Sequence, residues 1–404
     1  MISKSFSPSL IQLPLNPFSS TKAVSISDGV FVGDDGTAGL IQEITHTPLS
    51  KMLVKTYDNI IESGKIEHVL LLADYGQGKS FSISHIQNRI ISSLKYPIIS
   101  ISISEGAQEY VSEDHTILKT VIACLLEAFE KLPVSAYPNK EAVNLKYNLN
   151  KKTTRYQDTL KRFDKAFKEL HCYCFIFIDE LDKIVSVSDA IITEKSKRLF
   201  IEDLKTLADS LSHSVSLLIS GTNSVELFMK TQGQDYTQRF ALKKFSRMTY
   251  KEIDEFIEAQ CLNVLKKRSY SPFDSYAKNK IYNVANQNIR GVVSLCHKLW
   301  KKSASEKKGI DENFVNNFLE EASIELLKDI FPQADTQELA ILSKMIANKS
   351  VLTLSIHRTI IKPGVRNKIF DFIAKNSDKI NRVGRSFMIK PEIRKNVLNS
   401  ILES

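Results

Sequence analysis

Residues 73–80 read Ala-Asp-Tyr-Gly-Gln-Gly-Lys-Ser, a glycine-rich loop that ends in a lysine and a hydroxyl. Glycines allow successive backbone N–H groups to turn inward around phosphate oxygens. The lysine of such a loop reaches the outer phosphates, and the hydroxyl binds Mg²⁺. The loop therefore predicts a phosphate-binding site formed by Asp74, Tyr75, Gly76, Gln77, Gly78, Lys79, Ser80 and Phe81.

The elements on either side of this loop favour the same interpretation. Residues 69–73 form an apolar run of strand length, and apolar residues recur with helical spacing from Phe81 to Ile90. The pattern G-x-x-x-x-G-K-[ST] has glycine where this chain has Ala73, and Gly76 can supply the flexibility instead. The alternative is a chance Gly-Lys-Ser on a surface turn, which the strand and helix in register make less favourable.

A second chemical candidate is the run of residues 174–180, Cys-Phe-Ile-Phe-Ile-Asp-Glu, an apolar strand that ends in two carboxylates. Next to a phosphate-binding loop, Asp179 would bind Mg²⁺ and Glu180 would orient and polarise the attacking water. A strand that ends in a solvated acidic turn is the plain alternative. Asp182 is interpreted as a helix cap or a salt-bridge partner.

Alternating strands and helices predict how these residues are positioned. Strands are expected at 69–73, 97–104, 174–179, 215–220 and 239–242, with helices at 48–63, 116–131, 154–170 and 193–212. This alternation predicts an α/β fold with a parallel sheet. Ligands bind at the carboxyl ends of such strands, where the loop, Asp179 and Asn223 all fall. Asn223 either faces the phosphates or caps the next helix.

From residue 249 onward the strands give way to helical patterns at 249–267, 274–286, 289–303 and 311–329. These predict a helical lid in which Arg290 opens the third helix and reaches the phosphates. The first 45 residues resemble an extended arm with a short hairpin around 30–32. This arm either lies along its own domain or a neighbouring subunit, or is a loosely ordered terminus. The expected domains are therefore 1–45, 46–245, 246–332 and 333–404.

Charge is concentrated at one end of the chain. Residues 341–404 contain thirteen Lys or Arg and four Asp or Glu, and this excess of nine equals the net charge of the whole chain. A localised basic segment favours a polyanionic partner, most often nucleic acid, although a solvated basic surface is the alternative.

The composition, 43% hydrophobic and 25% charged, is typical of a globular protein of more than one domain. No apolar run approaches the ~20 residues of a membrane span, and the N-terminus lacks a secretory pattern. We therefore expect a cytoplasmic protein without membrane contact. Five cysteines fit that compartment, and Cys172 and Cys174 are expected to be buried thiols rather than metal ligands.

With these motifs in order, the chain resembles the AAA+ ATPases, most closely the branch of origin-recognition initiators, transposon target-selection ATPases and STAND-type regulators. The resemblance covers about residues 45–330 and rests on residues 73–80 as Walker A, 175–180 as Walker B, 220–223 as sensor 1 and 288–290 as sensor 2. It implies ATP and Mg²⁺ as cofactors, ATP hydrolysis and a homo-oligomer. It also implies catalytic roles for Glu180, Asn223, Arg239 and Arg290.

The role of Arg239 follows from its place just before the last strand, where the family often has an arginine that acts on a neighbouring subunit's ATP. Arg247 is the competing candidate for this arginine finger. A structural salt bridge is the other reading of either residue.

The basic C-terminal segment resembles a winged helix, with helices at 336–348 and 365–376, a ribbon at 383–389 and a final helix from 391. This resemblance implies double-stranded DNA as a partner, contacted by Arg358, Lys362, Arg366, Lys368, Arg382 and Arg385. The leading hypothesis is thus an ATP-dependent, DNA-associated switch. The alternatives are a signalling or phage-defence ATPase whose C-terminal domain recruits a protein effector, and a nucleotide-binding scaffold with negligible turnover.

Overall fold

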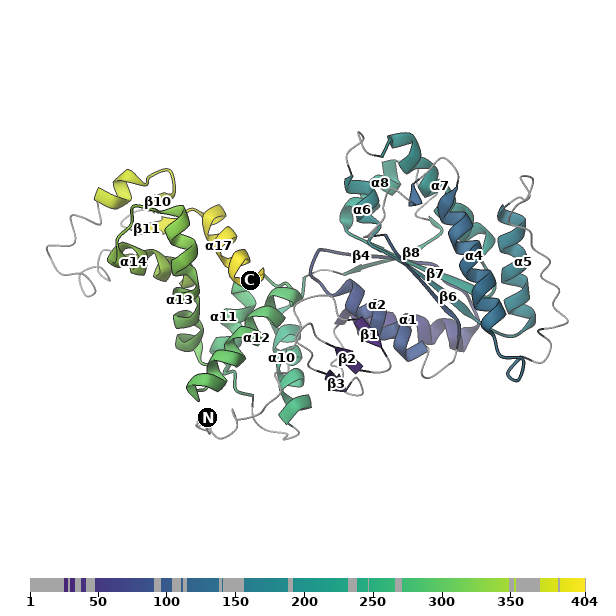
Figure 1. Ribbon diagram of the computed structural model, residues 1–404, viewed down its shortest axis with the longest axis horizontal. Helices are drawn as coiled ribbons and strands as arrows, with labels where there is room; N and C mark the ends of the chain where they lie inside the picture. The colour runs from purple at the N-terminus through teal and green to yellow at the C-terminus, as the bar shows by residue number, and fades with distance from the viewer. Residues whose placement is uncertain are drawn as a thin grey trace. The chain divides into compact units, whose positions relative to one another are not determined.

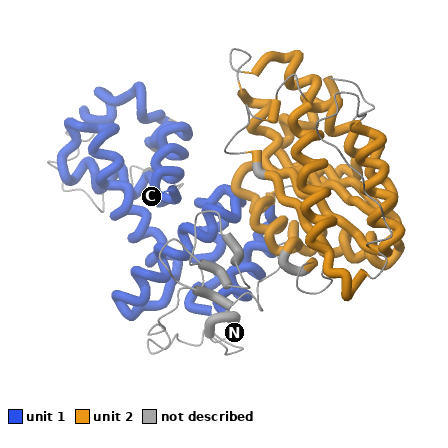
Figure 2. Tube along the Cα trace, turned by 45° about the vertical axis from the view of Figure 1, so that its right-hand side comes forward, with its two compact units in different colours: residues 1–45, 248–404 blue, residues 46–247 orange. Residues whose placement is uncertain are grey.

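The computed structural model divides into two compact units, unit 2 over residues 46–247 and unit 1 over residues 1–45 and 248–404 (Figure 2). The structure describes residues 25–27, 30–32, 38–40, 48–90, 96–103, 110–111, 115–137, 140, 156–187, 192–231, 238–245, 247–265, 271–348, 352–353, 371–383 and 386–403. Within these ranges, no helix is both long enough and apolar enough to span a bilayer.

Unit 2 is built on one parallel sheet (Figure 1). Its five strands lie in the order β5-β6-β7-β4-β8 and comprise β4 (Val69–Ala73), β5 (Ile98–Ser102), β6 (Cys174–Asp179), β7 (Val215–Gly221) and β8 (Ala241–Phe245). β4 therefore lies between β7 and β8, with Leu72 opposite Gly221 and Ala73 opposite Phe245. The carboxyl ends of all five strands meet at one edge of the sheet.

Side chains of β4 alternate between two apolar layers. Val69 and Leu71 pack with α1 (Pro48–Ser63) and α2 (Lys79–Arg89), whereas Leu70 and Leu72 pack into the core on the other face. That second layer contains α4 (Thr116–Lys131), α5 (Tyr156–Glu169) and α7 (Glu194–Ser210). Burial on both faces explains why β4 and most of β6 are continuous apolar runs. The sequence expectation of an α/β parallel sheet is confirmed.

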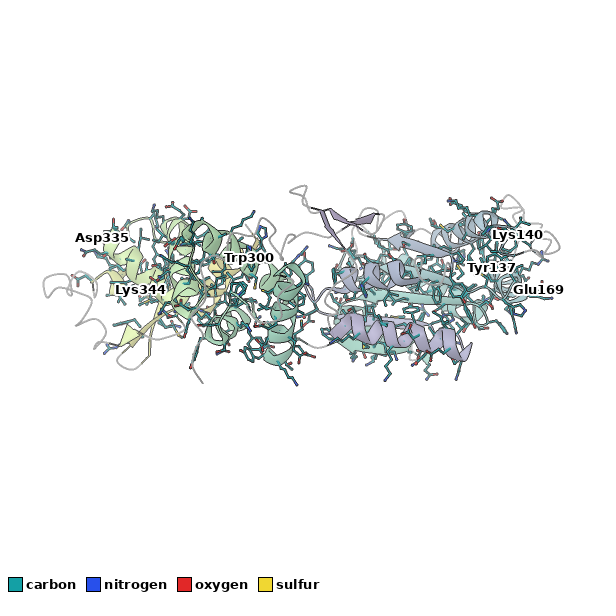
Figure 3. All side chains as sticks on the ribbon, turned by 90° about the horizontal axis from the view of Figure 1, so that it is seen from below. Tyr137, Lys140, Glu169, Trp300, Asp335 and Lys344 are labelled. Atoms are coloured by element: carbon teal, nitrogen blue, oxygen red, sulfur yellow. The ribbon has the colours of Figure 1, made fainter. Side chains whose placement is uncertain are left out.

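Polar side chains hold the edges of these layers. Lys140 Nζ donates to the carbonyl oxygen of Glu130, in the last turn of α4 (Figure 3). It also donates, at 2.7 Å, to the carbonyl oxygen of Leu132, just after the helix. Carbonyl groups at a helix C-terminus lack partners inside the helix, so a lysine at this place satisfies them.

In unit 1, the described residues from 248 to 330 form the helices α10 (Tyr250–Leu265), α11 (Ser275–Val284), α12 (Ile289–Glu306) and α13 (Glu312–Ile330). Side chains of Asp274, Asn288 and Asp311 accept backbone N–H bonds at the starts of the last three. Trp300 is 5% exposed and packs against Phe273 in their core (Figure 3). Caps at the residues before each helix explain why sequence reasoning placed these elements closely.

The C-terminal part of unit 1 comprises α14 (Thr336–Ala347), β9 (Leu352–Thr353), β10 (Ile380–Val383), β11 (Ser386–Ile389) and α17 (Pro391–Glu403). Asp335 and Glu338 form a capping box at the start of α14. β11 pairs antiparallel with both β10 and β9, and residues 371–375 are helical. The N-terminal strands β1 (Ser25–Ser27), β2 (Val30–Val32) and β3 (Ala38–Leu40) form a separate antiparallel sheet.

The bounds of the last strand of the parallel sheet differ from the sequence expectation. The last strand of the parallel sheet runs over Ala241–Phe245, so Arg239 precedes it rather than opening it. The reason is the register with β4, in which Val69 lies opposite Ala241 and His68 O accepts the Ala241 N–H at 2.7 Å. Arg239 therefore lies before the strand and takes no part in the backbone pairing of β8 with β4.

Candidate nucleotide-binding site

The loop between β4 and α2 has the backbone that the glycine pattern predicts. Gly76 and Gly78 adopt φ of 81° and 80°, the left-handed region that only glycine enters without strain. Ala73 is the last residue of β4 and pairs with Phe245, so an extended backbone suffices there. The missing first glycine is thus explained, because its position belongs to the strand. We call residues 73–80 the P-loop.

Lys79 opens α2, and its ammonium group turns back over the P-loop. Nζ donates to Ala73 O at 2.6 Å and to Asp74 O at 3.4 Å. Partial burial lowers the pKa of Lys79, while the nearby carboxylates of Asp182 and Asp179 oppose that shift. A partly desolvated cation at a helix N-terminus is well suited to bind phosphate oxygens.

Ser80 and Asp179 lie against each other at the carboxyl edge. Ser80 Oγ donates to Asp179 Oδ2 at 2.8 Å, and Ser220 Oγ donates to Asp179 Oδ1. A hydroxyl beside a carboxylate offers the hard oxygen ligands that Mg²⁺ prefers. The residues present therefore fit a magnesium ion held jointly by the end of β6 and the start of α2.

Glu180 is held in an unusual conformation next to Asp179. Its φ is +64°, and its N–H donates to Asp179 Oδ1 at 2.9 Å. A non-glycine residue in this region costs about 1–3 kcal/mol and is characteristic of functional sites. Glu180 Oε2 is buried and has no hydrogen-bond partner among the described residues. An unpartnered buried carboxylate oxygen fits a residue that would bind and polarise a water.

Asn223 and Arg247 both lie close to Asp74, the second residue of the P-loop. Asn223 is the first residue of α8 (Asn223–Thr231), and its Nδ2 donates to Asp74 Oδ1 at 3.2 Å. Arg247 Nε lies 3.9 Å from Asp74 Oδ2. The structure thus brings the predicted sensor-1 residue to the P-loop, and it adds an arginine that sequence reasoning considered only for a different role.

Residues 69–242, which contain nearly all of this site, match the family model of the ATPase family associated with various cellular activities (AAA). Unit 2 has the α/β P-loop NTPase fold. Solved structures similar to the chain include ORC2 of Aeropyrum pernix in ADPNP-ADP complexes, with 12% identity, coverage of 88% of this chain and 93% of that chain, and a TM-score of 0.44.

Two further solved structures are similar over most of their length. Cdc6p of Pyrobaculum aerophilum is 12% identical, with 89% of this chain and 96% of that chain covered and a TM-score of 0.43. The RuvB Holliday junction branch migration motor of Thermotoga maritima is 16% identical, with 88% and 95% covered and a TM-score of 0.40. No curated protein matches the sequence.

Three further predicted site residues lie in unit 2 or in unit 1. Tyr75 is 68% exposed on the P-loop. Arg239 pairs through Nε with Asp209 of α7. Arg290 is an exposed residue of the first turn of α12 in unit 1, and its predicted contact with the phosphates stays a prediction.

Most of the DNA-contact candidates fall outside the part of the chain that the structure describes. This applies to Arg358, Lys362, Arg366, Lys368 and Arg385. Arg382 is described, and it is exposed on β10 opposite Phe387 of β11.

Asp182 was interpreted as a cap or ion-pair residue, and its carboxylate opposes the lowering of the pKa of Lys79. Sequence reasoning gave one residue of the site no role of its own. Ser220 donates to Asp179 from the neighbouring strand. Ser220 stands next to the last residue of the buried strand β7, and only the pairing of β6 with β7 gives it Asp179 as a partner.

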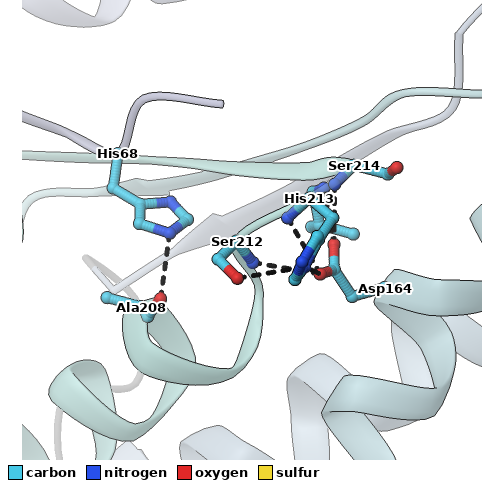
Figure 4. Close-up of polar contacts among 7 residues, drawn as sticks. His68, Asp164, Ala208, Ser212, His213 and Ser214 are labelled. Carbon is cyan, nitrogen blue, oxygen red and sulfur yellow. Dashed lines mark hydrogen bonds and ion pairs between the residues drawn. The ribbon is translucent and has the colours of Figure 1, made fainter. Parts of the chain in front are cut away.

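A second polar cluster of unit 2 contains a serine, a histidine and an aspartate (Figure 4). Ser212 Oγ lies 3.1 Å and Asp164 Oδ2 lies 2.9 Å from the same atom, His213 Nδ1. A nucleophilic triad needs the serine and the carboxylate on different ring nitrogens. Asp164 instead accepts the backbone N–H groups of residues 212–215, so the cluster fixes the turn before β7.

Proposed function

We propose that this protein binds and hydrolyses ATP with Mg²⁺ and acts as an oligomeric, DNA-associated switch of the initiator-like AAA+ branch. The convergence at one sheet edge carries the proposal: Lys79 on the P-loop, Ser80 against Asp179, and Glu180 with its unpartnered buried oxygen. The AAA family match over residues 69–242 supports the nucleotide as ATP.

The residues divide the work as their chemistry allows. Lys79 and the backbone N–H groups of the P-loop bind the phosphates, and Ser80 and Asp179 hold the metal, which supplies charge neutralisation when bound. Glu180 orients and polarises the attacking water. Asn223 and, in the assembled protein, an arginine from a second subunit contact the outer phosphate.

The DNA part of the proposal rests on the charge distribution. The excess positive charge lies in residues 341–404, and Arg382 is exposed on the β10–β11 ribbon. An antiparallel ribbon beside α14 and α17 is compatible with a winged-helix arrangement, in which phosphate contacts dominate affinity. Such binding weakens steeply with salt.

Steady-state ATP hydrolysis with and without duplex DNA tests the proposal. We expect Mg²⁺-dependent turnover in the wild type, a change in turnover on adding DNA, and a loss of about 100-fold or more in Glu180→Gln. Glu169→Gln, an exposed change on α5, is the matched control and should leave turnover unchanged.

Each negative outcome points to a different alternative. If DNA does not change the rate of ATP hydrolysis and does not bind to the protein at low salt, the DNA role is overturned. That result would favour an ATPase that recruits a protein effector. A wild type as inactive as Glu180→Gln, both with intact nucleotide binding, would favour a scaffold. Size-exclusion chromatography with ADP and with ATPγS tests whether the oligomer depends on the nucleotide.

A further inference from the structure

Asp74 lies between the ends of two strands and has one polar partner from each side. β4 is flanked by β7 and β8 in the sheet. Asn223 follows β7 and donates to Asp74 Oδ1 at 3.2 Å, and Arg247 follows β8 and lies 3.9 Å from Oδ2. The two oxygens of one carboxylate thus engage an amide from one neighbouring strand and a guanidinium from the other.

These partners are the kind that bind a phosphate. An amide N–H and a guanidinium are both donors to phosphate oxygens, and Asp74 belongs to the loop that surrounds the phosphates. A carboxylate that engages phosphate-binding donors competes with the phosphate for them. We propose that Asp74 is a specificity-determining residue that holds Asn223 and Arg247 until the outer phosphate of a nucleoside triphosphate displaces it.

The geometry makes this contact exchangeable. The side chains of Asp74 and Arg247 are 50% and 49% exposed, and 3.9 Å exceeds the 2.7–2.9 Å of a close charge-assisted hydrogen bond. Exposed ion pairs of this kind are weak. A diphosphate lacks the outer group that would take the two donors, so Asp74 should reduce affinity for the triphosphate more than for the diphosphate.

This inference rests on the proposed nucleotide site, and it concerns binding rather than turnover. The test is a set of equilibrium titrations with ATPγS and with ADP, each with Mg²⁺, from which the ratio of the two dissociation constants is taken. Asp74→Ala should raise the preference for ATPγS by about two- to fivefold. Asp74→Glu should restore a ratio close to that of the wild type, and Glu62→Gln, an exposed change on α1, should leave it unchanged.

A double-mutant cycle separates displacement from simple charge repulsion. If Asp74 acts by holding Asn223 and Arg247, Asp74→Ala has no effect on the ratio in a chain that also carries Asn223→Ala and Arg247→Gln. A gain of the same size in that background would overturn the inference, because it would mean that the charge of Asp74 only repels the phosphate. An unchanged or lowered preference in Asp74→Ala alone would overturn it too.

The Lys79→Ala variant distinguishes this inference from the proposed function. If the wild type and Lys79→Ala both fail to bind either nucleotide, the nucleotide site itself is wrong. If the wild type binds, Lys79→Ala does not, and Asp74→Ala keeps the wild-type ratio, then only the role of Asp74 fails.

Discussion

Ser80 donates a hydrogen bond to Asp179 at 2.8 Å, although the two residues are 99 positions apart in the sequence. The contact joins the first turn of α2 to the end of β6 and brings a hydroxyl and a carboxylate to one point. We expect Ser80→Ala and Asp179→Asn each to raise the Mg²⁺ concentration needed for tight ATP binding by about tenfold.

The measurement for these two variants is an ATP-binding titration at a series of Mg²⁺ concentrations. Binding measured with a chelator present should be the same in wild type and variants, because the metal no longer contributes. A Mg²⁺ dependence identical to that of the wild type in both variants would exclude this pair as the metal site.

Lys79→Ala tests the phosphate contact of the P-loop. The ammonium group is partly buried at the start of α2 and donates to the carbonyl oxygens of Ala73 and Asp74 in the P-loop. Loss of charge-assisted bonds to phosphate should weaken ATP binding by about 100-fold. Lys51→Ala, an exposed lysine on α1, is the control. Affinity equal to the wild type in Lys79→Ala would remove the nucleotide site.

Arg239 is paired with Asp209 in the same subunit, and it precedes β8 where an arginine finger is expected. If it acts on a neighbour's ATP, mixing Arg239→Ala with Lys79→Ala subunits should restore about one quarter of the interfaces. ATP turnover of the mixture, compared with each variant alone, is the measurement. If the mixture recovers no ATP turnover, and Arg239→Ala and Asp209→Ala lower the melting temperature equally, the ion pair has only a structural role.

Asp164 is 2% exposed and accepts four backbone N–H groups before and at the start of β7, at 2.8–3.1 Å. Removing it leaves buried donors of Ser214 and Val215 without an acceptor. We expect Asp164→Ala to lower the free energy of unfolding by about 2–4 kcal/mol. Denaturant unfolding measures this, with the exposed Lys161→Ala on the same helix as control. A loss below that of the control would contradict the structural role.

His68 predicts how the stability of unit 2 depends on pH. Burial lowers its pKa, and Leu217 N donates to Nδ1 while Nε2 contacts Ala208 O, an arrangement that fits only the neutral ring (Figure 4). The unfolded chain therefore binds the proton more readily. The contribution of His68 to the free energy of unfolding is constant above about pH 7. Below about pH 6.5 the free energy of unfolding falls by up to ~1.4 kcal/mol for each unit of pH.

Thermal unfolding between pH 5 and pH 8 measures this dependence, where ~5–8 is the range in which histidine titrates. His68→Gln should flatten the acid side of the curve, whereas the exposed His171→Asn should not. If the melting temperatures of the wild type and His68→Gln change with pH in parallel, the buried imidazole does not control the loss of stability at acidic pH.

Local pattern was enough to predict most elements of this chain. The helices at 48–63 and 116–131 have the bounds expected from apolar spacing, and the strand at 69–73 has the bounds expected from its apolar run. Period and capping are properties of neighbouring residues, so they can be read without a tertiary structure. The same holds for the P-loop and for the strand that ends in Asp179 and Glu180. The catalytic and binding roles of these residues stay predictions.

The sequence alone determined the strands that precede the P-loop and the pair Asp179 and Glu180, the place of the glycine-rich turn and the segment where basic charge gathers. Only the tertiary structure decided that β4 lies between β7 and β8, which gives Asp74 its two partners, Asn223 and Arg247. It also decided that Ser220 holds Asp179 and that Arg239 meets Asp209. Strand order and such distant contacts depend on how both faces of the whole sheet pack, and no local pattern encodes that balance.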